Sequence, residues 1–203
     1  MKAVRMISGR AVPLERSDVD TDQIIPASWL KRVERTGFGQ GLFAQWRDQR
    51  DFVLNRPEYA GATILLAGPN FGTGSSREHA VWALSDYGFE AVVSSRFGDI
   101  FRNNATKSGL VPVQVPQELL DRLIAAVKED PSLELTIDIE RLVVEAPSAG
   151  IVAAFPLDSF TQHRLLEGLD DIGLTLRYET DISAYEARRP AWLPAVSPVS
   201  PGA

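Results

Sequence analysis

A serine and an arginine stand at the end of a glycine-rich stretch in the middle of the chain. Gly72 and Gly74 allow tight backbone turns, and Ser75, Ser76 and Arg77 follow them. A guanidinium is a planar donor whose geometry suits carboxylates, and a serine can accept a proton when neighbouring donors stabilise its alkoxide. These residue types predict a carboxylate-binding site with an activated serine, although a capped helix behind a tight turn would use the same residues.

The elements around this stretch are a strand and a helix. The apolar run at 63–67 predicts a buried strand, and the spacing of apolar residues predicts a helix over 76–87. Ser75 and Glu78 match a capping box, so we expect Ser75 at the N-cap, where unpaired N–H groups favour an anion. Arg77 stands where a dinucleotide-binding motif or a nucleophile elbow requires glycine, and the lysine of a P-loop is absent. The stretch therefore does not match a nucleotide site.

The rest of the chain alternates strands and helices, which predicts an α/β layered domain. A hairpin is expected within 1–16, and the strand at 110–113 should lie near a sheet edge because it contains Pro112. The segment 31–56 mixes cationic side chains with glycines and aromatic residues, and it is either a solvated loop or a loop that recognises the substrate. The other expected elements are strands at 91–93, 133–137, 141–145 and 151–155, and helices at 100–107, 118–129, 159–167 and 175–188.

Composition and charge exclude several classes of protein. The 203 residues suffice for one domain with a core, and a net charge of −6 argues against a nucleic-acid partner. The chain has no apolar run of about 18 residues and its N-terminus lacks the apolar core of a signal peptide, so we expect a cytoplasmic protein without a membrane span. Cysteine is absent, which excludes disulfides and a cysteine-held cluster within this chain. His79 and His163 lie too far apart in sequence to indicate a zinc site, so no metal is expected here.

Several stretches of the chain carry a family resemblance. The most specific is Asn-Phe-Gly-x-Gly-Ser-Ser-Arg-Glu-His-Ala at 70–80, and the others lie at 18–26, 29–39, 94–101 and 168–173. Together they resemble the small subunits of 3-isopropylmalate dehydratase, which carry the swivel domain of the aconitase superfamily. Many relatives have cysteine where this chain has Thr73. Because that cysteine does not hold the cluster in the family, the difference leaves the functional prediction unchanged.

The resemblance implies a swivelling β/β/α layered domain over 1–188, followed by a proline-rich disordered tail at 189–203. This domain would close over an active site shared with a large subunit, in a heterodimer. The implied reaction interconverts 2-isopropylmalate and 3-isopropylmalate through 2-isopropylmaleate, by loss and return of water, in leucine biosynthesis. The implied [4Fe–4S] cluster must belong to the large subunit, since this chain has no cysteine. The alternatives are a subunit of a homoaconitase or citraconate-type hydratase, or a non-catalytic scaffold of the same fold.

The resemblance also assigns roles to individual residues. Ser75 matches the base that removes a proton next to a carboxylate, and Thr21 and Asp22 match an active-site segment whose detailed role is open. His79 is expected to make structural hydrogen bonds rather than to exchange protons. The residues expected to bind the dicarboxylate substrate are Arg77, Ser76, Arg32 and Arg35, with Lys31 as a further candidate for the second carboxylate.

Overall fold

The computed structural model describes residues 1–31, 36–75, 77–190 and 192–193. The chain forms two compact units, Met1–Leu169 and Asp170–Ala203, and each is described by itself. The expected boundary at residue 188 stays a prediction. Most of the tail that was expected to be disordered lies outside the described residues.

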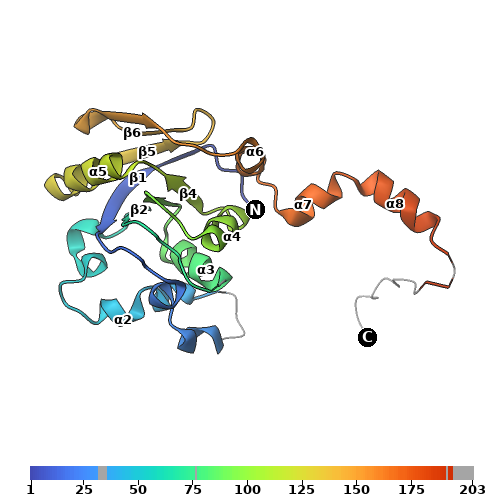
Figure 1. Ribbon diagram of the computed structural model, residues 1–203, viewed down its shortest axis with the longest axis horizontal. Coiled ribbons are helices and arrows are strands. Elements are labelled where there is room, and N and C mark those ends of the chain that lie inside the picture. The colour runs from blue at the N-terminus through green and yellow to red at the C-terminus, as the bar shows by residue number, and fades with distance from the viewer. Residues whose placement is uncertain (32–35, 76, 191, 194–203) are drawn as a thin grey trace. The chain divides into compact units, whose positions relative to one another are not determined.

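A seven-stranded sheet forms the centre of the first unit, with the strand order β4-β3-β2-β1-β5-β6-β7. Neighbouring strands from β4 to β1 are parallel, and those from β1 to β7 are antiparallel (Figure 1). The strands are β1 (Met6–Leu14), β2 (Ile64–Ala67), β3 (Ala91–Ser94), β4 (Val111–Gln114), β5 (Glu134–Asp138), β6 (Val143–Ala146) and β7 (Ile151–Ala154). The strands predicted after residue 60 are therefore confirmed, and β4 lies at the sheet edge as Pro112 indicated.

The hairpin expected within 1–16 is wrong, because β1 is a single strand of nine residues. Its first half, Met6–Arg10, pairs with β5, and its second half, Ala11–Leu14, pairs with β2. Gly9 does not make a turn: a Cβ atom there would lie 2.2 Å from Oγ1 of Thr63, so the glycine permits a close approach of the segment before β2. One strand thus joins the parallel and antiparallel halves of the sheet.

Helices cover both faces of the sheet. α5 packs against β1, β2 and β3, while α3 and α4 pack against each other on the opposite face (Figure 1). The apolar face predicted for α5 is confirmed, and each of its buried leucines contributes about 1.5–3 kcal/mol by leaving water. The α-helices of this unit are α1 (Thr21–Ile24), α2 (Ala44–Arg47), α3 (Glu78–Tyr87), α4 (Asp99–Ser108), α5 (Gln117–Glu129) and α6 (Ser159–Glu167). The 3₁₀ helices are η1 (Ala27–Lys31), η2 (Phe38–Gly41), η3 (Val53–Asn55), η4 (Pro57–Tyr59) and η5 (Pro147–Ala149).

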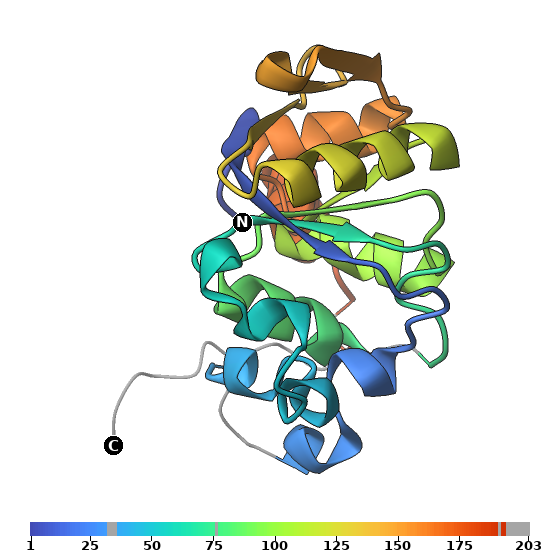
Figure 2. The same cartoon turned by 90° about the vertical axis from the view of Figure 1, so that its left-hand side faces the viewer.

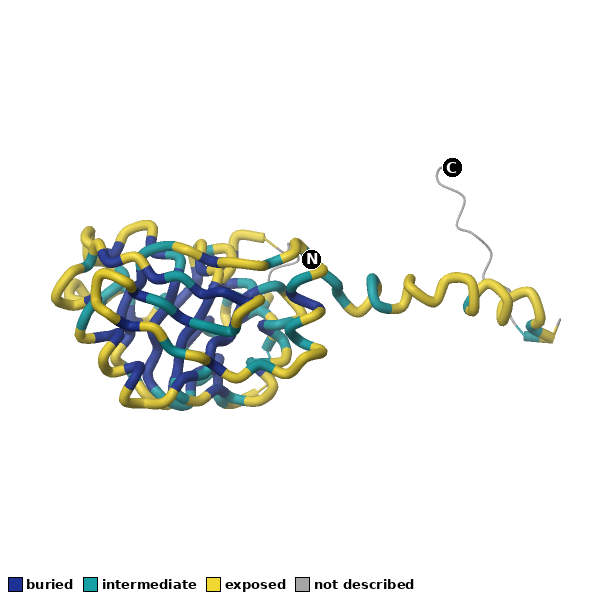
Figure 3. The backbone as a smooth tube through the Cα atoms, turned by 90° about the horizontal axis from the view of Figure 1, so that it is seen from above, coloured by how far each residue is buried: buried dark blue, intermediate teal, exposed yellow. Residues whose placement is uncertain are grey.

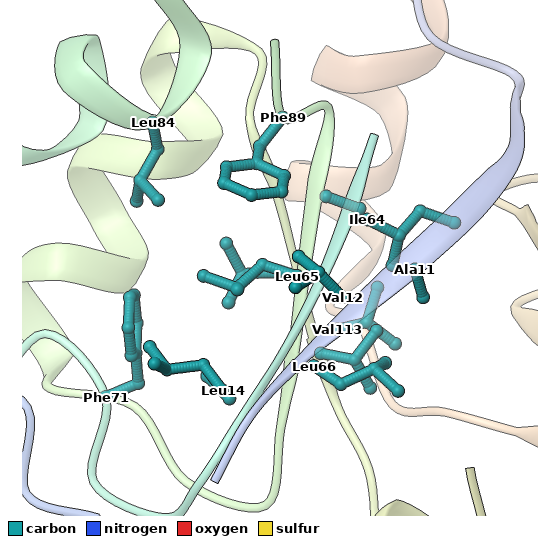
Figure 4. Close-up of a cluster of buried hydrophobic side chains, with 14 of the residues drawn as sticks. Ala11, Val12, Leu14, Ile64, Leu65, Leu66, Phe71, Leu84, Phe89 and Val113 are labelled. Carbon is teal, nitrogen blue, oxygen red and sulfur yellow. The ribbon is translucent and has the colours of Figure 1, made fainter. Parts of the chain in front are cut away.

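The hydrophobic core reaches the start of the glycine-rich segment. Every residue of β2 and β3 is buried, as expected for parallel strands that are covered on both faces (Figure 3). Leu65 and Phe71 lie on the same side of the strands as Leu84 of α3 (Figure 4). The ring of Phe71 meets that of Phe101 from α4 edge-on, with 5.3 Å between centroids. The segment after β2 is therefore anchored in the core.

The second unit contains two short helices, α7 (Asp171–Leu176) and α8 (Glu179–Ala187). The single helix expected over 175–188 is wrong in its start and its continuity. The Asp170 carboxylate accepts a hydrogen bond of 2.7 Å from the Gly173 N–H, and this cap begins a helix earlier in the chain. No helix in the described part of the chain is long and apolar enough to span a membrane.

Candidate active site at the carboxyl ends of the parallel strands

Three loops meet at one edge of the sheet. They follow β1, β2 and β3, and because these strands are parallel, their carboxyl ends lie at the same edge. The buried Ser94 hydroxyl donates to the Gly68 carbonyl at 2.8 Å, and the Phe71 N–H donates to the Arg96 carbonyl at 3.0 Å. These bonds fix the loop after β2 against the loop after β3.

The glycines of the central loop allow the close packing. Gly72 has φ +75°, and a Cβ atom on it would lie 2.2 Å from Cγ of Phe101. A Cβ atom on Gly98 would lie 2.4 Å from the Gly72 carbonyl oxygen. Gly74 has φ +90°, a conformation that a residue with a side chain rarely adopts. These glycines therefore allow the loops to pack closely just before Ser75.

The loop after β1 pairs with the glycine-rich loop through its backbone. Asp20 and Thr73 form an isolated parallel bridge. The Gly72 N–H donates to the Val19 carbonyl at 2.7 Å, and the Thr21 N–H donates to the Thr73 carbonyl at 3.0 Å. Two segments that are far apart in sequence thus run side by side up to the serine.

Thr21, Asp22, Ser75 and Arg77 come together where these segments end. The buried Thr21 hydroxyl donates to the Ser75 carbonyl at 3.0 Å. Nη1 of Arg77 forms an ion pair with Oδ1 of Asp22, and the Arg77 side chain is only 19% exposed. The Ser75 residue itself is exposed. The arrangement leaves Ser75 exposed to solvent, and two residues later in the chain the Arg77 guanidinium is held by a carboxylate.

The capping box expected at Ser75 and Glu78 is wrong. Helix α3 begins at Glu78, and its N-cap is Arg77, which makes no side-chain cap hydrogen bond. The Ser75 carbonyl accepts from Thr21 instead of opening the helix, so Ser75 stays in the loop. The expected support of a Ser75 alkoxide by the helix N-terminus therefore does not follow from this geometry.

A capping box is present at the start of α1 instead. The Asp20 carboxylate accepts from the Gln23 N–H at 2.8 Å, and Oε1 of Gln23 accepts from the Asp20 N–H at 2.9 Å. The sequence carried the signal, because an aspartate followed three residues later by glutamine is a capping-box pattern. The sequence analysis did not predict this cap, which begins the short helix that carries Thr21 and Asp22.

Part of the segment 31–56 packs against α3, the helix that follows the glycine-rich loop. Among the short helices between residues 21 and 59, α1 and η2 pack against α3, whereas η3 and η4 pack against β1 (Figure 2). The Phe38 N–H donates to Oδ2 of Asp86 at 3.0 Å, and the His79 ring lies 5.3 Å from the Phe38 ring and 4.7 Å from the Trp82 ring. His79 thus packs against two aromatic rings, and the structural hydrogen bonds expected for it stay a prediction.

Lys31 is the one remaining candidate for substrate binding that the structure describes. Lys31 is exposed at the end of η1. No group of three or more side chains suited to a metal occurs among the described residues, and the chain has no cysteine. The predicted substrate-binding residues Arg32, Arg35 and Ser76 lie outside the described residues.

Comparison with known proteins identifies the family. The aconitase C-terminal domain model matches residues 1–118, and the model for the C-terminal domain of the 3-isopropylmalate dehydratase small subunit matches residues 171–198. The 3-isopropylmalate dehydratase small subunit of Frankia alni is 63% identical over 96% of this chain and 99% of its own length. That of Rubrobacter xylanophilus is 56% identical over 97% of this chain and 100% of its own. The crystal structure of 3-isopropylmalate dehydratase from Methanocaldococcus jannaschii matches with a TM-score of 0.65 and 25% identity, covering 89% of this chain and 99% of that one.

The fold agrees with these matches, since a mixed α/β sheet with a parallel and an antiparallel half is what the aconitase-type domain predicts. The family resemblance seen in the sequence is therefore confirmed along nearly the whole chain. The chain belongs to the family of 3-isopropylmalate dehydratase small subunits.

Proposed function

We propose that this chain is the small subunit of a 3-isopropylmalate dehydratase, a hydro-lyase of leucine biosynthesis that works in the cytoplasm together with a large subunit. The enzyme interconverts 2-isopropylmalate and 3-isopropylmalate through 2-isopropylmaleate. The observation that carries the proposal is the meeting of Thr21 and Asp22 with Ser75 and Arg77, in a chain that matches such subunits over nearly its full length.

In the proposed mechanism, Ser75 accepts the proton from the substrate carbon next to a carboxylate. A serine is a weak base, so its alkoxide needs a positive neighbour, and Arg77 supplies it. The same guanidinium has further N–H donors for a substrate carboxylate, because the ion pair with Asp22 involves only one of its nitrogens. When water returns, the hydroxyl adds to the carbon that lost the proton, and Ser75 delivers its proton to the neighbouring carbon that lost the hydroxyl, which gives the other isomer.

Thr21 and Asp22 act on these two residues in different ways. The Thr21 hydroxyl holds the Ser75 backbone, and the Asp22 carboxylate holds the Arg77 guanidinium in place. Arg32, Arg35 and Ser76 are proposed to hold the rest of the dicarboxylate on the strength of the family resemblance. The substrate class is a malate bearing an alkyl group.

This chain cannot hold an iron–sulfur cluster, because it has no cysteine. A [4Fe–4S] cluster on the large subunit would supply the Lewis acid for the departing hydroxyl. The part of this chain is then to bind and orient the carboxylates, to move the proton, and to close the site against water.

Reconstitution tests the proposal. The chain and a 3-isopropylmalate dehydratase large subunit from the same genome are expressed together without oxygen, and the purified complex is assayed with 2-isopropylmalate, 3-isopropylmalate, homocitrate and citramalate. We expect turnover of the two isopropylmalates only in the complex. Preference for homocitrate or citramalate would assign the chain to another hydratase of the superfamily. A complex that forms with full cluster content but converts none of the substrates would favour a non-catalytic scaffold.

A further inference from the structure

Asp18 and Asn70 stand in an unusual backbone conformation and touch each other. The described non-glycine residues with positive φ are Asp18 (55°), Phe43 (48°), Asn70 (59°) and Leu142 (55°). Nδ2 of Asn70 donates to Oδ1 of Asp18 at 2.6 Å. Aspartate and asparagine are the side chains that tolerate this left-handed region best, and such residues cluster at functional sites.

The contact between Asp18 and Asn70 lies where the backbone pairing between the loop after β1 and the loop after β2 begins. The Asp18 N–H donates to the Pro69 carbonyl at 2.9 Å, and the next residue, Val19, accepts from the N–H groups of Gly72 and Thr73 at 2.7 and 3.2 Å. The same pairing ends with Thr21 on Ser75 and Asp22 on Arg77. The contact between Asp18 and Asn70 therefore lies at one end of the pairing and the site residues lie at the other.

We propose that Asp18 and Asn70 form a positioning pair for the dehydratase reaction, an inference that rests on the function proposed above. Neither side chain contacts the four site residues in the described part of the chain. The pair acts through the backbone, holding residues 19–22 opposite 72–75 so that Thr21 reaches Ser75 and Asp22 reaches Arg77. A shift of one residue in this register would separate both contacts.

The chemistry of the pair makes two contributions that can be separated. One is the hydrogen bond, and the other is tolerance of positive φ at both positions. An alanine at either position would disfavour the left-handed conformation by roughly 5- to 30-fold. A glycine would keep that conformation accessible while removing the hydrogen bond.

The test uses the reconstituted complex with 3-isopropylmalate. We expect Asn70→Gly and Asp18→Gly to lower kcat about 10-fold or more, Asn70→Ala to lower it further, and the melting temperature of the complex to change little in the glycine variants. The double variant Asp18→Asn with Asn70→Asp exchanges donor and acceptor and restores the bond. It should return kcat to within about threefold of the parent.

Ser8→Ala is the matched control, because it also removes an exposed side-chain hydrogen bond, that of 3.0 Å to Thr136 in the antiparallel half, and it should leave kcat unchanged. The inference is overturned if the glycine variants turn over like the parent, or if the exchanged variant folds but stays as slow as the single ones. The exchanged variant decides the matter even where a glycine variant does not fold. An inactive parent complex would instead contradict the proposed function.

Discussion

The hydrogen bond from Thr21 to Ser75 offers a sharp test of how this site is held. Thr21 is 3% exposed, and its hydroxyl donates to the Ser75 carbonyl at 3.0 Å. Thr21→Val keeps the shape of the side chain and removes the donor. The loss of a buried hydrogen bond costs about 1–1.5 kcal/mol, and more when the acceptor is left without a partner.

That free energy has two expected consequences. The melting temperature should fall by roughly 2–4 °C for each kcal/mol in a chain of this size. If the bond also holds Ser75 in its catalytic position, its loss lowers the equilibrium constant for that position by about 5- to 10-fold, and kcat falls by up to the same factor. We expect both effects in Thr21→Val, measured as turnover of 3-isopropylmalate by the complex alongside its melting curve.

Thr21→Ser is the control for the loss of stability alone. It keeps the hydroxyl and removes one buried methyl group, which costs about 1 kcal/mol, similar to the cost of the valine variant. We expect a similar fall in melting temperature with kcat within about threefold of the parent. The reasoning is refuted if the two variants have the same kcat, because Thr21 would then stabilise the fold without positioning Ser75.

Four further outcomes are expected. Ser75→Ala should lower kcat by about 100-fold or more with an unchanged melting curve, since Ser75 does not cap α3; a clear loss of stability would mean that Ser75 has a structural role. Arg77→Lys keeps the charge but loses the planar fork, so kcat/KM should fall at least about 10-fold, or 1.4 kcal/mol, and near-normal steady-state kinetics would make Arg77 structural. The purified chain without its partner should contain no stoichiometric iron and show no dehydratase activity, because it has no cysteine; iron analysis and assay check this. The hydrogen bond from the Thr161 N–H lowers the pKa of Asp158 below its usual 3.8, so its contribution to stability is full above that pH and is lost as the pH falls through the lowered value; the difference in melting temperature between the parent and Asp158→Ala should shrink accordingly, and a pH-independent difference would contradict the assignment.

The sequence by itself determined the elements that depend on local pattern. The buried runs of β2 and β3 and the amphipathic face of α5 are visible in the spacing of apolar residues, because burial on one or both faces imposes that spacing. The glycines before Ser75 were also visible in the sequence. Positive φ is a requirement of the single residue, and it favours glycine at that position. The family followed from these residues and their order.

Prediction from local sequence pattern failed where the structure depends on contacts with distant segments. Two stretches match the capping-box pattern, but only Asp20 and Gln23 form a capping box in the structure. Ser75 stays in the loop, where its carbonyl accepts a hydrogen bond from Thr21. In the same way, nothing local shows that β1 continues through Gly9, because that depends on Thr63 lying against it.

Only the tertiary structure decided how the site is assembled. Thr21 and Ser75 are 54 residues apart, and Asp22 and Arg77 are 55 apart. Their contacts exist because β1 and β2 are parallel neighbours whose carboxyl ends meet, and because the backbone pairing after these strands fixes the register. The sequence named the residues, but the partner of each side chain is set by strand order, which no single segment encodes.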